Sequence, residues 1–94
     1  MASRAGGTDR VSTKTKLAAD LVVLGRALVR ARETRGLKQS EVAAILGLPA
    51  SYMSKIENGT RRLDVIEFVR IAEAMGVDPA EIIRALQKDL TSER

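Results

Sequence analysis

The stretch QSEVAAILGLPASYMSKIEN, residues 39–58, contains two short amphipathic runs separated only by Gly47, Leu48 and Pro49. Isolated helices need about 12–15 residues to be even marginally stable in water, because nucleating a helix is costly. Two runs this short must therefore pack on each other and on further helices. The second run is also polar and partly basic, which the packing of a plain helix bundle does not require.

The spacing within residues 39–58 predicts two helices that cross steeply at a tight turn. Ala43 is small enough to let another helix axis come close, and Gly47 can adopt the positive φ that the turn needs. Val42, Leu46, Leu48, Met53 and Ile56 are expected to face a core. Together with Gln39, these positions fit the helix-turn-helix motif, and a plain helical hairpin with a glycine turn is the alternative.

The composition describes a small globular domain and limits its chemistry. Of 94 residues, 45% are hydrophobic and only 2% aromatic, and there is neither cysteine nor histidine. The absence of these two residue types excludes disulfides, Cys/His zinc sites and catalysis by a thiol or an imidazole. The carboxylates show no paired spacing either. We therefore expect no enzyme activity, no metal site and no cofactor.

The charges are distributed unevenly along the chain. Residues 1–62 hold 12 Lys and Arg against 5 Asp and Glu, whereas residues 63–94 hold 4 against 7. A basic half joined to an acidic half suggests that one face meets a polyanion, and nucleic acid is the polyanion favoured over an anionic membrane surface. No apolar run approaches the length of a membrane span, and the first residues lack the apolar stretch of a signal peptide. A cytoplasmic protein associated with the nucleoid is expected.

Periodicity and capping residues predict an all-α domain of five helices. The expected helices are residues 16–35, 39–46, 50–57, 65–75 and 79–89, within a domain of residues 16–90. Residues 1–15 lack periodicity and are expected to form a disordered arm, and residues 91–94 are expected to fray. Asp64 with Glu67 forms a capping-box pattern before the fourth helix. In the first helix, one apolar stripe is expected to face the core: Leu17, Leu21, Leu24, Leu28 and Ala31.

Two segments of this pattern carry a resemblance to a known family. ARETRGLKQSEVAAILGLPASYMSKIENGTRR, followed by FVRIAEAMGVDPAEII, resembles the Cro/CI (Xre-type) helix-turn-helix domain of phage repressors and bacterial regulators. The resemblance covers roughly residues 24–86. It implies a lambda-repressor-like domain, here with an extended first helix, that binds double-stranded DNA and regulates transcription.

The resemblance also implies roles for particular residues. Arg32 and Glu57 match the family's buried ion pair between the first and third helices. Three positions fall where the recognition helix meets base edges: Ala50, Ser51 and Lys55. A further set falls where the family contacts the sugar-phosphate backbone: Gln39, Tyr52, Ser54, Asn58, Thr60, Arg61 and Arg62.

Two residues depart from the family pattern at the start of the recognition helix. Pro49 stands where the family usually has Ser or Thr as the N-cap, and Ala50 stands where a long polar residue is common. Alanine can make only an apolar contact with a base, for example with a thymine methyl. Few side chains are therefore expected to read bases directly, and recognition of DNA shape is expected to supply more of the specificity.

The fourth and fifth helices carry more apolar residues than one core stripe requires. The expected stripe of the fourth helix is Val65, Phe68, Ala72 and Met75, and Ile66, Val69 and Ile71 broaden it. Either the extended first helix covers this surface within one chain, or the surface forms a homodimer interface. A repressor that acts as a homodimer on two half-sites is the leading hypothesis. The alternatives are an antitoxin that binds a toxin and regulates its own synthesis, and a protein-interaction adaptor.

Overall fold

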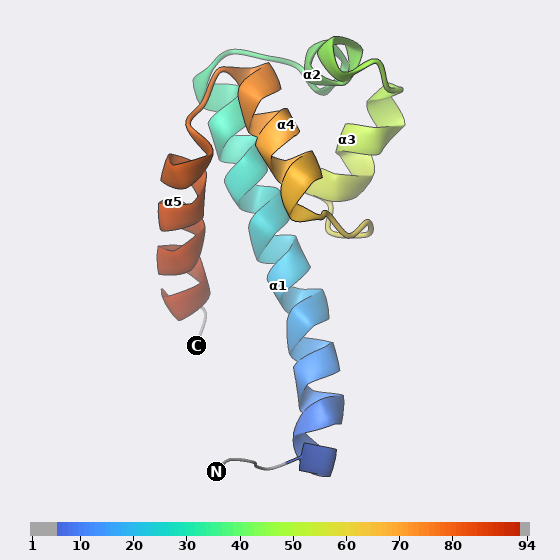
Figure 1. Ribbon diagram of the computed structural model, residues 1–94, viewed down its shortest axis with the longest axis vertical. Coiled ribbons are helices and arrows are strands. Elements are labelled where there is room, and N and C mark those ends of the chain that lie inside the picture. Colours follow the sequence, from blue (N-terminus) through green and yellow to red (C-terminus); the bar gives the residue numbers. More distant parts are fainter. Residues whose placement is uncertain (1–5, 93–94) are drawn as a thin grey trace.

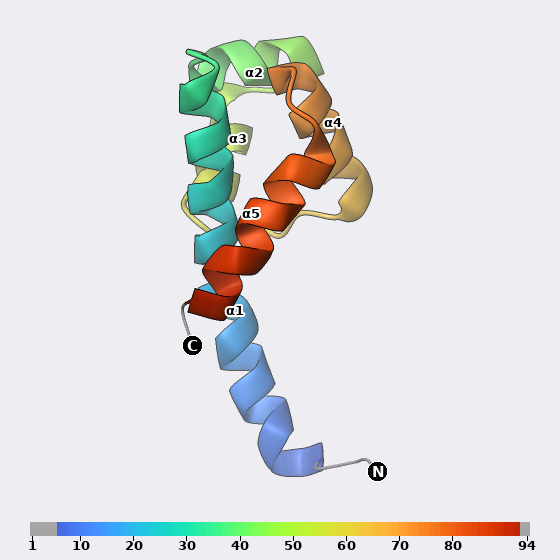
Figure 2. The same ribbon diagram turned by 90° about the vertical axis from the view of Figure 1, so that its left-hand side faces the viewer.

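The computed structural model describes residues 6–92, with side chains from residue 16 onward. Within this range the chain forms five helices and no strand, which confirms the predicted all-α class. The helices are α1 (Gly6–Thr34), α2 (Gln39–Leu46), α3 (Ala50–Glu57), α4 (Val65–Met75) and α5 (Pro79–Ser92). The C-terminal half of α1 packs between α3 and α5, while its N-terminal half projects beyond the other helices (Figures 1 and 2).

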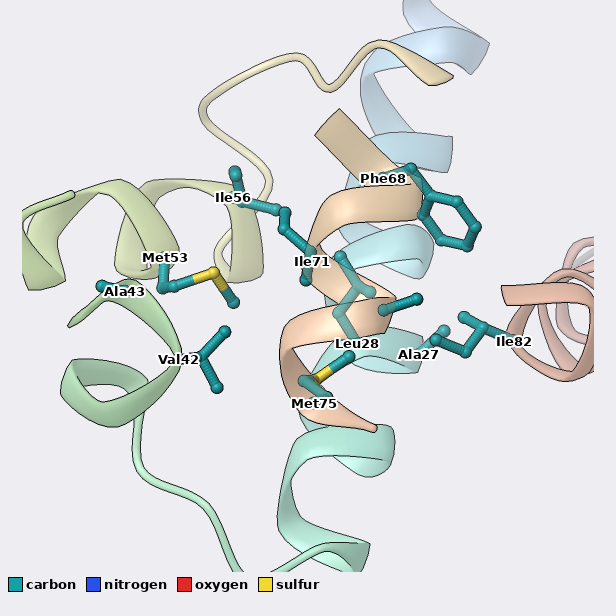
Figure 3. Close-up of a cluster of buried hydrophobic side chains, with 11 residues drawn as sticks. Ala27, Leu28, Val42, Ala43, Met53, Ile56, Phe68, Ile71, Met75 and Ile82 are labelled. Carbon is teal, nitrogen blue, oxygen red and sulfur yellow. The ribbon is translucent and has the colours of Figure 1, made fainter. Parts of the chain in front are cut away.

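The hydrophobic core lies where α1, α2, α3 and α4 converge (Figure 3). Leu28, Val42, Met53 and Ile71 are almost completely buried, and Ile82 of α5 closes the cluster on the side away from α2. Ala43 is also buried, at the contact between α2 and α3, where its small side chain allows the two helices to approach. The two short helices are thus stabilised by tertiary packing, since neither is long enough to be stable alone.

Local capping interactions end α2 and begin α4 at the residues that the sequence predicted. Gly47 has φ of 73°, and its N–H donates to Ala44 O while that of Leu48 donates to Ala43 O. This is a Schellman-type ending, for which glycine is favoured because it lacks a Cβ. At the start of α4, the Asp64 carboxylate accepts the Glu67 N–H at 2.7 Å, and the Glu67 carboxylate accepts the Asp64 N–H at 3.0 Å. The predicted capping box is therefore present.

The two ends of the domain differ from their expected boundaries. Helix α1 begins at Gly6, so it includes most of the segment expected to be a disordered arm; residues 1–5 lie outside the described part. Once a helix is nucleated, each further residue adds a backbone hydrogen bond at low cost, so α1 extends beyond its packed half. Helix α5 likewise continues to Ser92, past the expected end at residue 89.

The buried faces of α1 and α4 also differ from the predicted stripes. In α1 the fully buried apolar residues are Val23, Ala27 and Leu28, whereas Leu17 is 48% exposed. The reason is that α1 packs on α3 along one side and on α5 along another, so its buried surface is not a single stripe. Val65 is 73% exposed, because Phe68 and Ile71 provide the inward face of the first turns of α4. Leu48, expected in the core, is 40% exposed in the turn.

Gly25 sets the distance between α1 and α3. A Cβ at this position would lie 2.2 Å from the carbonyl oxygen of Glu57 and 3.0 Å from that of Ile56. Only a residue without a side chain allows the α1 backbone to pass this close to the end of α3. The sequence shows Gly25 only as a glycine inside a helical pattern, and the crossing that requires it is a tertiary feature.

A buried ion pair joins α1 to α3 at the same end. Arg32 Nε donates to Glu57 Oε2 at 2.7 Å, and Arg32 Nη2 donates to Glu57 Oε1 at 2.9 Å. Arg32 Nη1 also donates to the backbone oxygen of Leu37 at 2.9 Å, and Gln39 Nε2 donates to Glu57 Oε1 at 2.8 Å. The two charged side chains are only 12% and 4% exposed. The hydrogen bonds that Arg32 donates to Glu57 raise the pKa of Arg32.

Gly25→Ala is expected to destabilise the protein. Alanine in place of glycine inside a helix ordinarily adds about 1 kcal/mol of stability. Here the added methyl group collides with the backbone of α3, and overpacking of this kind costs about 1–3 kcal/mol. Urea unfolding would measure the change. Gly47→Ala, where no atom lies within 4 Å of the added Cβ, is the comparison that carries backbone strain without a collision. A more stable Gly25→Ala variant would contradict the close crossing.

Arg32→Leu is expected to lower the free energy of unfolding by about 3–5 kcal/mol, because it leaves the Glu57 carboxylate buried without its partner. The double variant with Glu57→Leu should recover part of this loss. Arg70→Leu is the matched control, since the Arg70–Glu73 pair is 67% and 56% exposed and such pairs contribute about 0–1 kcal/mol. Urea unfolding would again measure the changes. Equal losses of stability in Arg32→Leu and Arg70→Leu would show that burial of the Arg32–Glu57 pair has no special role.

Candidate nucleic-acid interface

Helix α3 turns one side toward the core and leaves the other side open. Met53, Ile56 and Glu57 are its buried residues. The residues predicted to read base edges are all exposed on the opposite side: Ala50, Ser51 and Lys55. Ser51 and Lys55 lie one helical turn apart, so their side chains share one face. This exposed face is the candidate for entering a groove of DNA.

The first turn of α3 begins without a side-chain cap. Pro49 is the N-cap residue in extended conformation, with φ of −71° and ψ of 154°, and it accepts the Tyr52 N–H at 3.0 Å through its backbone oxygen. Proline fixes φ near this value, so it sets the direction in which α3 starts even though it cannot cap the helix. Because Ala50 and Ser51 are small, no long side chain covers this end of the helix.

The loop that follows α3 is held together by its own polar groups. Asn58 Oδ1 accepts hydrogen bonds from the Thr60 backbone N–H at 3.1 Å and from the Thr60 hydroxyl at 2.6 Å. The backbone N–H groups of Thr60 and Arg61 donate to Lys55 O at 2.9 and 3.2 Å. The side-chain carbonyl of Asn58 therefore holds the loop together. Its side-chain amide nitrogen remains as a candidate donor to a phosphate. Gly59, with φ of 81°, lets this loop pass against α1 at Val22.

Gln39 lies at the start of α2, beside the end of α3. One of its amide hydrogens is donated to Glu57 Oε1, and its side chain is half-buried. The second amide hydrogen is not used in this bond and can be donated to a phosphate. Gln39 is thus both part of the buried Arg32–Glu57 network and a predicted backbone contact. Ser54, another predicted backbone contact, is half-buried on α3.

Tyr52, Arg61 and Glu67 form a compact polar cluster between α3 and α4. Arg61 Nη2 lies 3.1 Å from Glu67 Oε2, and the Tyr52 hydroxyl donates to the same oxygen at 3.2 Å. The Arg61 guanidinium also stacks over the Tyr52 ring, 4.7 Å from its centroid. Burial raises the pKa of Tyr52, and the neighbouring Glu67 adds to that effect. The backbone hydrogen bond from Asp64 lowers the pKa of Glu67, so the carboxylate is ionised at neutral pH.

The structure separates the cations of this region into two kinds. Arg61 is paired with Glu67, and its side chain is 39% exposed. Lys55 and Arg62 are exposed and form no ion pair with any residue that the structure describes. Sequence reasoning placed Arg61 and Arg62 together as backbone contacts and did not identify Glu67 as part of the site. The capping-box pattern identified Glu67 only as a helix-start residue, because its contacts with Tyr52 and Arg61 depend on tertiary packing.

Other kinds of site find less support in the described residues. They contain no group of three or more His, Cys, Asp or Glu residues that could hold a metal ion. Their helices include none that is both long and apolar enough to cross a membrane.

Comparison with known proteins identifies the family. The helix-turn-helix family model HTH_3 matches residues 28–82. An XRE-family like protein from Pseudomonas syringae pv. tomato shares 43% identity with a TM-score of 0.73, over 82% of this chain and 94% of that one. The restriction-modification controller protein C.AhdI from Aeromonas hydrophila shares 34% identity with a TM-score of 0.65, over 69% of this chain and 94% of that one.

A curated relative agrees with the structural matches. The chain is 36% identical over 61 residues to the HTH-type transcriptional regulator y4dJ of Sinorhizobium fredii. The alignment covers 65% of this chain and 79% of the relative. Residues 28–82, which the family model matches, contain the crossing of α2 and α3, the buried ion pair and the loop after α3. The chain therefore belongs to the Cro/CI (Xre-type) helix-turn-helix family of DNA-binding transcription regulators.

Proposed function

We propose that this protein is a sequence-specific regulator that binds double-stranded DNA as a homodimer and represses transcription by occluding a promoter. The observation that carries the proposal is the open face of α3, on which Ser51 and Lys55 are exposed, together with the exposed Arg62 in the loop that follows, which forms no ion pair with a described residue. Lys55 can donate to O6 or N7 of guanine, Ser51 can bond either kind of base, and Ala50 can contact a thymine methyl.

The backbone contacts proposed for this interface lie near the C-terminal end of α3, whose exposed face with Ser51 and Lys55 is the proposed reading face. Gln39 is hydrogen-bonded to Glu57 at that end, and the loop with Asn58, Thr60 and Arg62 continues from it. Such contacts fix the position of a protein on the duplex without reading the sequence. With so few base-reading groups on α3, shape and deformability of the DNA are proposed to supply part of the specificity.

The proposed dimer forms through an apolar groove between α4 and α5. This groove has a volume of about 320 Å³, and Asp64 is the one polar residue among those that line it. Val65 at 73% and Ile83 at 47% exposure lie along it, and Leu24 of α1 also lines it, which supports the proposal that a partner covers this surface. Two reading helices must lie one helical turn of DNA apart, roughly 34 Å, to meet two half-sites. An antitoxin is the second candidate, in which a toxin occupies the same groove.

Arg62→Ala is expected to weaken binding to all duplexes about equally and to flatten the dependence of affinity on salt. Each phosphate contact removed should reduce the slope of log K against log salt by about 0.9, counted once for each copy of the chain. Lys55→Ala should instead reduce discrimination at one base position, by about 1–3 kcal/mol. Selection from a random duplex library, followed by fluorescence anisotropy at several salt concentrations, would measure both effects.

The matched control for these variants is Arg84→Ala, which removes an exposed cation from α5, away from α3. Its affinity should remain close to that of the original protein. If Lys55→Ala and Arg62→Ala leave affinity and salt slope unchanged, the assignment of the DNA-binding face is wrong.

Ile83→Glu is expected to convert the dimer to a monomer, because it places a charge in the centre of the apolar groove. Sedimentation equilibrium would give the mass of each form. Ile45→Glu serves as the comparison, since Ile45 is a 63% exposed residue on α2 outside the groove. If the unaltered chain is already monomeric at micromolar concentration, the homodimer proposal fails and the toxin-binding alternative gains support.

A further inference from the structure

Glu67 holds two of the residues that the family resemblance assigns to the DNA backbone, Tyr52 and Arg61. Its Oε2 atom accepts the Tyr52 hydroxyl at 3.2 Å and lies 3.1 Å from Arg61 Nη2. The hydrogen bond from Tyr52 to Glu67 joins α3 to the first turn of α4. An anionic side chain therefore contacts the two residues that are expected to bind the anionic DNA backbone.

The Tyr52 hydroxyl cannot serve Glu67 and a phosphate as a donor at the same time. A phenol has one O–H, and in this structure that hydrogen is donated to Glu67. Donation to a phosphate therefore requires the bond to Glu67 to break. The exchange replaces one charge-assisted hydrogen bond by another, so its contribution to binding is smaller than that of a free hydroxyl.

Arg61 is in a similar position, because its charge is already neutralised. Besides the contact with Glu67, its Nη1 donates to the backbone oxygen of Arg62 at 3.0 Å, and its plane rests on the Tyr52 ring. If a phosphate takes Arg61, Glu67 loses its counter-charge and must be compensated from solution. The neighbouring Arg62 forms no ion pair with any described residue, although the two arginines are adjacent in sequence.

Glu67 cannot easily turn away from this cluster. Its other oxygen, Oε1, accepts the Asp64 N–H at 3.0 Å in the capping box at the start of α4. That hydrogen bond lowers the pKa of Glu67, so the carboxylate stays charged at neutral pH. The anion is therefore fixed at a distance from which it competes with any phosphate that approaches Tyr52 and Arg61.

We propose that Glu67 is an intramolecular competitor of the DNA phosphate for Tyr52 and Arg61, and that it weakens DNA binding and its salt dependence. The inference rests on the proposed function, in that it requires this face to bind DNA. It identifies Glu67 as an affinity-determining residue that itself makes no contact with the DNA.

Glu67→Gln tests the proposal with little change in shape. Glutamine also fits the capping box, so α4 should keep its start. With the competing charge removed, affinity for a mixed-sequence duplex that spans two half-sites should rise roughly three- to ten-fold. The slope of log K against log salt should steepen by about 0.9 for each copy, because Arg61 now acts as a free cation. In an Arg61→Ala background, the gain from Glu67→Gln should be much smaller.

Glu73→Gln is the matched control, since it removes one exposed carboxylate from the same helix at the Arg70 ion pair. It should change affinity less than two-fold, as expected for a screened surface charge. Equal gains from Glu67→Gln and Glu73→Gln would show a general effect of net charge and overturn the proposal. Weaker binding by Glu67→Gln would overturn it too, by showing that Glu67 positions Tyr52 and Arg61 for the phosphate.

A second measurement uses the unaltered protein and so does not depend on the folding of a variant. The NMR signals of Arg61 Nε–H and of the Tyr52 ring should shift when the duplex is added to saturation. Unchanged signals at saturation would overturn the proposal, because no exchange would have taken place. If the unaltered protein binds no duplex even at low salt, the proposed function fails as well, which distinguishes the two failures.

Discussion

The carboxylate of Glu57 receives hydrogen bonds from Arg32 of α1 and Gln39 of α2, although it lies at the end of α3. It therefore connects all three helices at one buried point. An unpaired carboxylate in this place would be strongly unfavourable, so the position of α3 relative to α1 and α2 is tightly specified. The guanidinium suits this role because it donates to both carboxylate oxygens and to Leu37 O at once. The orientation of the proposed reading face of α3 depends on this connection, because contacts with the other helices determine where that face points.

Close packing completes the specification. Gly25 lets the backbone of α1 approach the end of α3, and Ala43 lets α2 approach α3. Both are small residues at points where another helix crosses α3. The hydrogen bonds of Glu57 and the close packing at Gly25 and Ala43 thus both act on this one short helix. An eight-residue helix has little stability of its own, and its orientation is an outcome of these contacts.

The polar surface beside the reading face is less uniform than its sequence suggests. Arg61 and Arg62 are adjacent, yet Arg61 is stacked on Tyr52 and paired with Glu67, while Arg62 is exposed and forms no ion pair within the described part of the chain. The same holds for apolar side chains, since Phe68 is buried while Val65 and Ile83 line an open groove. Surface residues of this kind are available to partners, and DNA and a second copy of the chain are the partners proposed for them.

Sequence alone determined the features that depend on local geometry. The bounds of α2, α3 and α4, the glycine ending at Gly47 and the capping box at Asp64 all follow from short-range preferences. The Arg32–Glu57 pair was implied by the family resemblance. Tertiary structure decided which sides of α1 and α4 are buried, because periodicity shows that a helix has an apolar side but does not show how many neighbours it meets. It also decided that Gly25 must be glycine and that Glu67 holds Tyr52 and Arg61, since both depend on groups brought together only by folding.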